Sequence, residues 1–139
     1  MNRFRDRKIL IIEDERLIVQ VWMIYFEQAG YRNIRQAETG LEGLQIAREW
    51  RPDLIISDVM HPGPDGFDIF NELFLDPRTL STRFIMASGC APSPQPEFSD
   101  KLSTAGVSVY LKKPFDPREL VACAQKVFTE AEKETLKGL

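Results

Sequence analysis

The chain has 139 residues, of which 43% are hydrophobic and 28% are charged, so its composition is that of a globular domain and not of a disordered chain or a membrane protein. A chain of this length is expected to form one domain and to bury a core without disulfide or metal staples. The net charge of -3 argues against a nucleic acid as the direct partner.

The predicted elements alternate between strand and helix. The apolar run 8–12 predicts a short buried strand, and apolar residues recur at helical spacing from 17 to 25. Residues 34–37 predict a second strand, and residues 41–47 a second amphipathic helix that ends before the next proline. A third strand ends at Asp58, and the helix after it carries regularly spaced phenylalanines.

The second half of the chain continues the pattern. Residues 83–87 and 107–111 predict two more strands, and the run 116–119 opens the last helix with a capping box and a proline at the first helical position. The stretch 91–96 between these strands contains three prolines, so a helix there is confined to about 97–103 and is predicted to be short or poorly ordered. Five strands alternating with helices imply an α/β fold with a parallel sheet covered on both faces.

We expect a single domain, 1–139, with a core from about 8 to 128, a solvated basic tail at 1–7 and a charged extension of the last helix at 129–139. No signal peptide precedes the first apolar run, which is too short to span a bilayer, so the expected location is the cytoplasm, without a membrane partner. In that reducing compartment Cys90 and Cys123 are expected to be free thiols.

Asp58 raises the first question about function, because it directly follows the apolar run 54–57. A buried carboxylate without a partner is unfavourable, so Asp58 caps a turn, sits at an exposed strand end, or belongs to a charged site. In open parallel sheets ligands bind at the carboxyl ends of the strands. The polar residues predicted at those ends are Glu13, Asp14, Asp58, Ser88 and Lys113.

Three carboxylates in one cleft repel each other, and a divalent cation such as Mg²⁺ relieves that repulsion. In such a site Asp58 can act as a nucleophile and form an aspartyl-phosphate. Lys113 can offer its ammonium to one phosphoryl oxygen, and the Ser88 hydroxyl can donate to another. The pattern therefore favours phosphoryl transfer.

The chain also resembles the receiver domain of two-component response regulators, from Lys8 to about Phe128. The matching motifs are ILIIEDE, DVMHPGPDG, IMASG and YLKKPF, in the family's order. The resemblance implies a flavodoxin-like doubly wound sheet of five strands in the order 2-1-3-4-5, with five helices. It implies that Asp58 is the phosphoacceptor and Lys113 the phosphate-binding lysine. The implied Mg²⁺ ligands are Glu13, Asp14, Asp58 and the backbone carbonyl of Met60.

The same resemblance implies a switch built from Ser88 and Tyr110, in which phosphorylation draws in the hydroxyl and the aromatic ring rotates. It implies a phosphoacceptor rather than an enzyme, with at most self-phosphorylation from small donors and autodephosphorylation. Because the residues 129–139 only extend the last helix, we expect this phosphoacceptor to be stand-alone. Its donor would be a sensor histidine kinase or a histidine phosphotransfer protein, and its output would go to a downstream protein target. It would be a monomer or a phosphorylation-dependent dimer.

Some residues depart from the family pattern. Gly89 stands where receivers usually carry alanine, and His61 and Pro64 stand where they often carry apolar residues. We interpret His61 as a solvated loop residue. Trp22 and Trp50 are better explained by packing than by ligand stacking.

Three alternatives remain. A haloacid-dehalogenase-like phosphohydrolase needs a second aspartate two residues after the nucleophile, where this chain has Met60. A flavin carrier of flavodoxin type would hold phosphate after the first strand, where the acidic run 13–15 repels it. A degenerate receiver that only binds proteins would not need Asp58, Ser88 and Lys113.

Overall fold

The computed structural model describes residues 2–58, 63–79, 81–88 and 109–137, with the backbone alone at 88, 109, 110 and 112. Within these residues five parallel strands form one sheet in the order β2-β1-β3-β4-β5. The strands are β1 (Lys8–Ile12), β2 (Asn33–Ala37), β3 (Leu54–Asp58), β4 (Arg83–Ser88) and β5 (Val109–Lys112). The helices are α1 (Arg16–Gln28), α2 (Gly40–Trp50), α3 (Gly66–Phe74) and α5 (Pro117–Lys137). The predicted flavodoxin-like fold and strand order are confirmed, and the helix expected at 97–103 lies outside the described residues.

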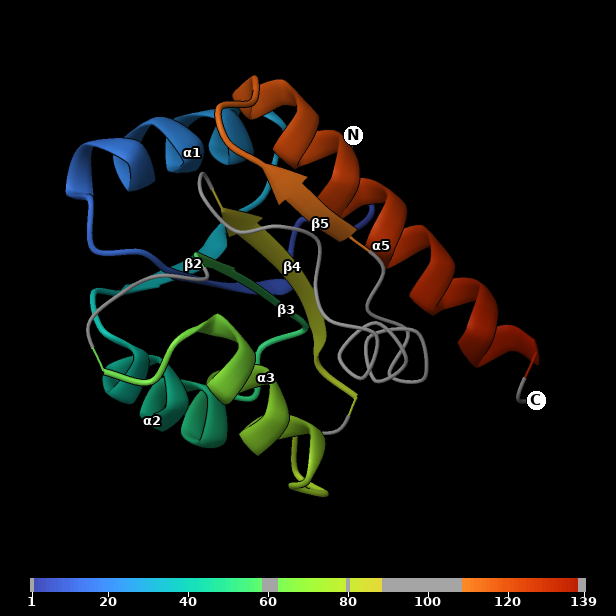
Figure 1. Ribbon diagram of the computed structural model, residues 1–139. Helices are drawn as coiled ribbons and strands as arrows, with labels where there is room; N and C mark the ends of the chain where they lie inside the picture. Colours follow the sequence, from blue (N-terminus) through green and yellow to red (C-terminus); the bar gives the residue numbers. More distant parts are fainter. Residues whose placement is uncertain (1, 59–62, 80, 89–108, 138–139) are drawn as a thin grey trace.

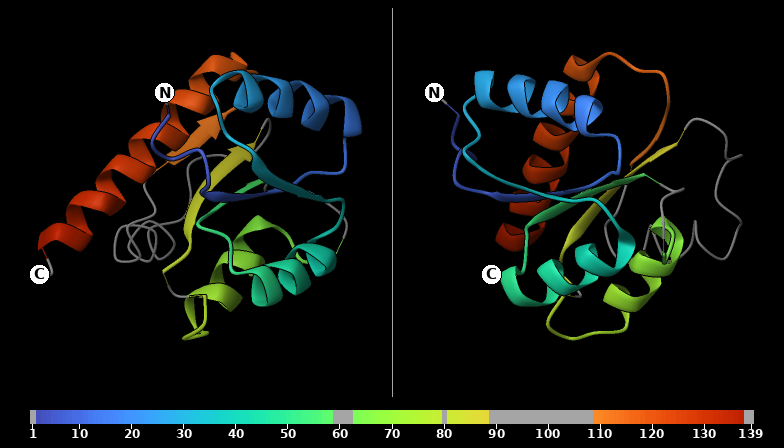
Figure 2. Two further views of the ribbon diagram at one scale, coloured as in Figure 1. Left: turned by 180° about the vertical axis from the view of Figure 1, so that it is seen from behind. Right: turned by 90° about the vertical axis from the view of Figure 1, so that its left-hand side faces the viewer.

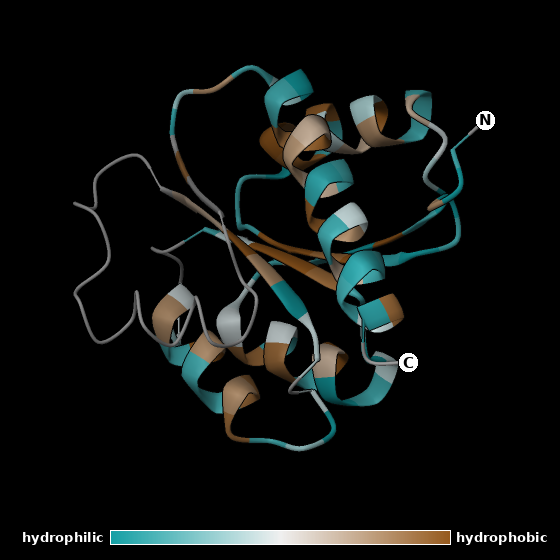
Figure 3. Ribbon diagram, turned by 90° about the vertical axis from the view of Figure 1, so that its right-hand side faces the viewer, coloured by the Kyte–Doolittle hydropathy of each residue, from teal (hydrophilic) through white to brown (hydrophobic). Residues whose placement is uncertain are grey.

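Helices cover both faces of the sheet, with α1 and α5 on one face and α2 and α3 on the other (Figures 1 and 2). Successive strand residues point to opposite faces, so Ile9 and Ile11 join the core under α1 and α5, while Leu10 and Ile12 join the core under α2 and α3. Figure 3 shows the result as apolar strands enclosed between helices that carry both polar and apolar residues. Burial on both faces explains the continuous apolar runs of the sequence.

The helix ends are held by local hydrogen bonds. The Asp116 carboxylate accepts from the backbone N–H of Arg118 at 2.9 Å and so caps α5, as predicted. The backbone N–H of Glu119 donates to the Asp116 carbonyl and not to its carboxylate, so this cap is not the capping box that the sequence predicted. A complete capping box, with reciprocal bonds between Asp65 and Asp68, opens α3. These caps set where the helices begin relative to the loops that follow β3 and β5.

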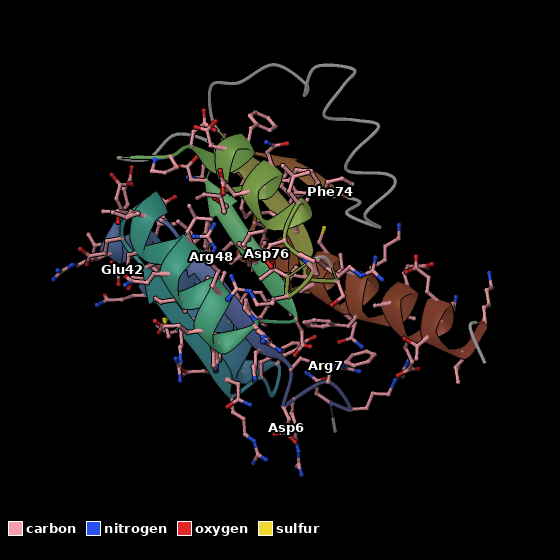
Figure 4. All side chains as sticks on the ribbon, turned by 90° about the horizontal axis from the view of Figure 1, so that it is seen from below. Asp6, Arg7, Glu42, Arg48, Phe74 and Asp76 are labelled. Carbon is pink, nitrogen blue, oxygen red and sulfur yellow. The ribbon has the colours of Figure 1, made fainter. Side chains whose placement is uncertain are left out.

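A polar contact joins the outer helices α2 and α3 (Figure 4). Arg48 donates from Nη2 to Glu72 at 3.1 Å, and its Nε lies 3.8 Å from Asp76. Arg78 also donates to Asp76, and these hydrogen bonds lower the pKa of that carboxyl. The network fixes the end of α3 against α2, far from the carboxyl ends of the strands.

The N-terminal segment is not only a solvated tail, and that prediction is corrected by Phe4. Its side chain is 1% exposed, and its ring lies 5.5 Å from the ring of Phe128, centroid to centroid. The arginines of the segment remain at the surface, where Arg3 pairs with Glu132 of α5 at 3.3 Å. Burial of this ring anchors the segment while the flanking charged side chains keep their contact with water, and the Asn2 side chain adds a hydrogen bond to the Ala29 carbonyl.

The last helix continues to Lys137, so the charged residues after 128 extend it as predicted. Arg83 at the start of β4 forms an ion pair with Glu134 of this extension. Cys123 is a half-buried free thiol whose pKa burial raises, and Cys90 lies outside the described residues. Among the helices that the structure describes, none is long and apolar enough to cross a membrane.

Candidate functional site

Three carboxylates meet at the carboxyl ends of β1 and β3. Glu13 and Asp14 directly follow β1, and Asp58 is the last residue of β3. The two strands are hydrogen-bonded neighbours with Ile12 opposite Ser57, so both chains end at the same edge. One carboxylate oxygen from each of the three acids lies within 4.8 Å of the others. The predicted acidic cluster is therefore present.

The three acids differ in their contact with solvent. Glu13 is fully buried at 0% exposure, Asp58 has 13% of its side chain exposed, and Asp14 is exposed. The Oε1 atom of Glu13 is buried and has no hydrogen-bond partner among the described residues. Burial, followed by the negative charge of Asp58, raises the pKa of Glu13 from 4.5 to about 7, although Lys113 acts in the opposite direction.

Among the described residues, Lys113 is the one basic residue whose side chain contacts this cluster. It follows β5, and its Nζ lies 3.3 Å from Asp58 Oδ2 and 3.4 Å from Glu13 Oε2. Only 20% of its side chain is exposed, so these ion pairs are partly shielded from water. A single ammonium leaves three carboxylates undercompensated.

The donor set fits a divalent cation with oxygen ligands. Three clustered carboxylates, one of them with a buried oxygen that no described residue binds, are typical of such sites. Hard oxygen donors without sulfur or imidazole in the described cluster favour Mg²⁺ over softer metals.

For two other predicted site residues, Ser88 and Tyr110, the structure describes the backbone only. Ser88 ends β4 one residue beyond Ala87, which lies opposite Asp58 in the sheet, so its backbone is at the correct edge. Tyr110 lies in β5 opposite Met86. The structure describes neither of their side chains, and Met60 and His61 lie outside the described residues.

One neighbour of the cluster was missed by sequence reasoning. Trp22 of α1 is 5% exposed and belongs to the core, as predicted, but the Nζ of Lys113 also lies 5.7 Å from its ring centroid. Trp22 stacks on Phe115 with centroids 5.7 Å apart and planes at 22°. Beside them is a pocket of about 450 Å³ lined by Ile18, Trp22, Lys113, Pro114 and Phe115. No local sequence signal links a residue of α1 to a lysine in the loop after β5.

The comparison with known families decides the assignment. The family described as "Response regulator receiver domain" matches residues 9–125, which is most of the chain. The chain belongs to the response regulator receiver domain family. This confirms the resemblance that the four sequence motifs indicated, and a receiver domain is generally a signalling phosphoacceptor rather than an enzyme.

Curated relatives agree with this assignment. The receiver domain is 36% identical over 117 residues to the DNA-binding dual master transcriptional regulator RpaA of Synechocystis, covering 83% of this chain and 46% of the relative. It is 31% identical over 128 residues to the alkaline phosphatase synthesis transcriptional regulatory protein PhoP of Bacillus subtilis, covering 91% of this chain and 50% of the relative. The chain therefore spans about half the length of these relatives.

Solved structures of receivers share the fold. A CheY-like receiver domain protein from Methanospirillum hungatei superposes with a TM-score of 0.77 at 28% identity, covering 93% of this chain and 98% of that one. The chemotaxis response regulator CheY4 of Vibrio cholerae superposes with a TM-score of 0.73 at 30% identity, covering 88% of this chain and 98% of that one.

Proposed function

We propose that this receiver accepts a phosphoryl group on Asp58 from a histidine kinase or a histidine phosphotransfer protein. One observation carries the proposal: the Asp58 carboxylate lies at once in a cluster of three acids and 3.3 Å from the ammonium of Lys113. That combination offers a nucleophile, ligands for a cation and a positive charge for a phosphoryl oxygen.

In the proposed reaction an Asp58 carboxylate oxygen forms a bond to the phosphorus as the bond from phosphorus to the donor's imidazole nitrogen breaks. The electron pair of the broken bond leaves with the imidazole, so no oxidant or further reactant is needed. Lys113 already points its ammonium at Asp58 and would bind an oxygen of the transferred group. The Ser88 hydroxyl is proposed to donate to another.

Glu13, Asp14 and Asp58 would hold Mg²⁺, together with the backbone carbonyl of Met60. When bound, the cation would neutralise negative charge shared by the carboxylates and the phosphoryl oxygens. Glu13 is suited to a ligand role, directly or through water, because its buried Oε1 has no hydrogen-bond partner in the part of the chain that the structure describes.

The output we propose is a switched protein-binding surface rather than direct contact with nucleic acid, for which a net charge of -3 is unfavourable. Ser88 and Tyr110 are the proposed switch residues, because phosphate at Asp58 adds charge and strong acceptors next to the end of β4. Phosphorylation would then change the partner bound, or would form a dimer.

The test is uptake of phosphate from a small acyl phosphate, acetyl phosphate, in the presence of Mg²⁺. Intact mass spectrometry should show one added phosphoryl group on the unaltered protein and none on Asp58→Asn, because an amide is a poor nucleophile. Asp53→Asn is the matched control, since Asp53 lies just before the opposite end of the same strand. Equal labelling of Asp58→Asn and the unaltered protein would remove Asp58 as the acceptor.

A phosphatase assay separates this function from the hydrolase alternative. A receiver should not turn over p-nitrophenyl phosphate, whereas a phosphohydrolase would release nitrophenol continuously. Sustained turnover that depends on Asp58 would replace the proposed function.

A further inference from the structure

In the proposed function Lys113 must reach a phosphoryl group on Asp58, yet its long side chain is flexible and its contacts with the carboxylates are loose. A lysine side chain is a point charge on a flexible four-carbon stem. The pocket of about 450 Å³ that Lys113 lines gives this stem room to move beside the site. Both contacts with carboxylates, 3.3 Å to Asp58 and 3.4 Å to Glu13, are long for charge-assisted hydrogen bonds.

The aromatic pair described above supplies a third contact. The Lys113 ammonium lies 5.7 Å from the centroid of the Trp22 ring, within the range in which an aromatic face attracts a cation. Trp22 cannot easily turn away, because it is 5% exposed and its ring stacks on Phe115. Phe115 stands two residues after Lys113, so the same loop that carries the lysine also holds the ring.

We propose that Trp22 is a positioning residue for phosphoryl transfer, whose ring holds the Lys113 ammonium beside Asp58. The inference rests on the proposed function, since it concerns how the lysine is presented to a phosphoryl group. Trp22 does not touch the reacting atoms and acts through Lys113. The carboxylates and the ring both attract the ammonium, and together they limit how far it moves along the pocket that Trp22 itself lines.

The first experiment compares the rate of phosphorylation by acetyl phosphate at saturating Mg²⁺. Trp22→Leu keeps apolar volume but removes the aromatic face, and it should lower the rate about two- to fivefold, the range given by an ordinary cation–π contact. Trp22→Phe keeps an aromatic face and should restore most of the rate. Trp50→Leu is the matched control, because the guanidinium of Arg35 lies 4.4 Å from the centroid of its ring at the end of α2, away from the site. Its rate should equal that of the unaltered protein.

A double-mutant cycle separates positioning from a purely structural effect. In a Lys113→Ala background, Trp22→Leu should cause no further loss of rate. The same fold-loss in both backgrounds would overturn the proposal, as would an unchanged rate for Trp22→Leu alone. If the unaltered protein takes up no phosphoryl group, the proposed function itself fails.

A spectroscopic measurement covers the case in which Trp22→Leu does not fold. In a Trp50→Phe variant Trp22 is the sole tryptophan, and Lys113→Ala should change its emission because the nearby ammonium is lost. Lys126→Ala, an exposed lysine of α5, should leave the emission unchanged. Emission that is insensitive to Lys113→Ala would contradict the contact on which the proposal depends.

Discussion

Glu13 gives the sharpest test of the electrostatics of the acidic cluster. In metal-free protein, Glu13→Gln should raise the free energy of unfolding at pH 8 and have little effect below pH 4.5. The reason is that the side chain is fully buried, next to the charge of Asp58, and its pKa rises from 4.5 to about 7. A neutral amide of similar shape avoids the burial of that charge.

The sign and size of this change in the free energy of unfolding follow from the protonation of Glu13 in the folded state and in the unfolded chain. The folded state holds the Glu13 proton more tightly than the unfolded chain, so protonation of Glu13 stabilises the fold. This stabilisation is complete below pH 4.5 and is lost as the pH rises through about 7. Between pH 4.5 and about 7 each pH unit lowers the free energy of unfolding by about 1.4 kcal/mol, so ionised Glu13 should lower it by about 3 kcal/mol at pH 8. That is a large part of the stability of an ordinary domain.

The assay is urea unfolding followed by far-UV circular dichroism in the presence of EDTA, at intervals from pH 4.5 to pH 8. The difference between Glu13→Gln and the unaltered protein should grow with pH and level off above about pH 7. Glu15→Gln, which changes an exposed acid two residues later, should show no such growth. A difference for Glu13→Gln that does not depend on pH would refute this account of the cluster.

Three further predictions concern the metal ligands and the core. Asp14→Ala should weaken Mg²⁺ binding at least about tenfold, because it removes one of three clustered carboxylates; a fluorescence titration equal to that of the unaltered protein would contradict this. Gly43→Ala should destabilise the fold by about 1–3 kcal/mol in urea unfolding, because the new Cβ would lie 2.5 Å from Ile12 Cδ1. Phe4→Ala should cost about 3 kcal/mol and Arg5→Ala much less, since Phe4 is buried and Arg5 exposed; equal losses would restore the solvated-tail interpretation.

The sequence by itself determined the architecture and the edge at which the site lies. Strands such as 9–12 and 54–56 can be recognised from the local sequence alone, because a strand buried on both faces needs an apolar residue at each position. Parallel strands then bring their carboxyl ends together, so Glu13, Asp14 and Asp58 could be grouped before any distance was known. For Lys113 the same reasoning placed the side chain at the correct edge.

Only the tertiary structure decided which face of α1 is buried. This helix is apolar almost all round, and it buries Val19, Trp22 and Phe26 while leaving Leu17 at 77% exposure and Ile24 at 52%. A periodic pattern selects a face only when polar residues mark the other one. Here the positions of the sheet and of α5 made the choice.

Tertiary structure also decided how deeply each acid of the cluster lies and what surrounds the lysine. Glu13 and Asp14 are adjacent in sequence, yet Glu13 is fully buried and Asp14 is exposed, because neighbours after a strand point in different directions. The contact between Trp22 and Lys113 joins α1 to the loop after the last strand of the sheet. Such a contact depends on how a helix packs across strands far apart in the chain, and local sequence patterns carry no information about that distance.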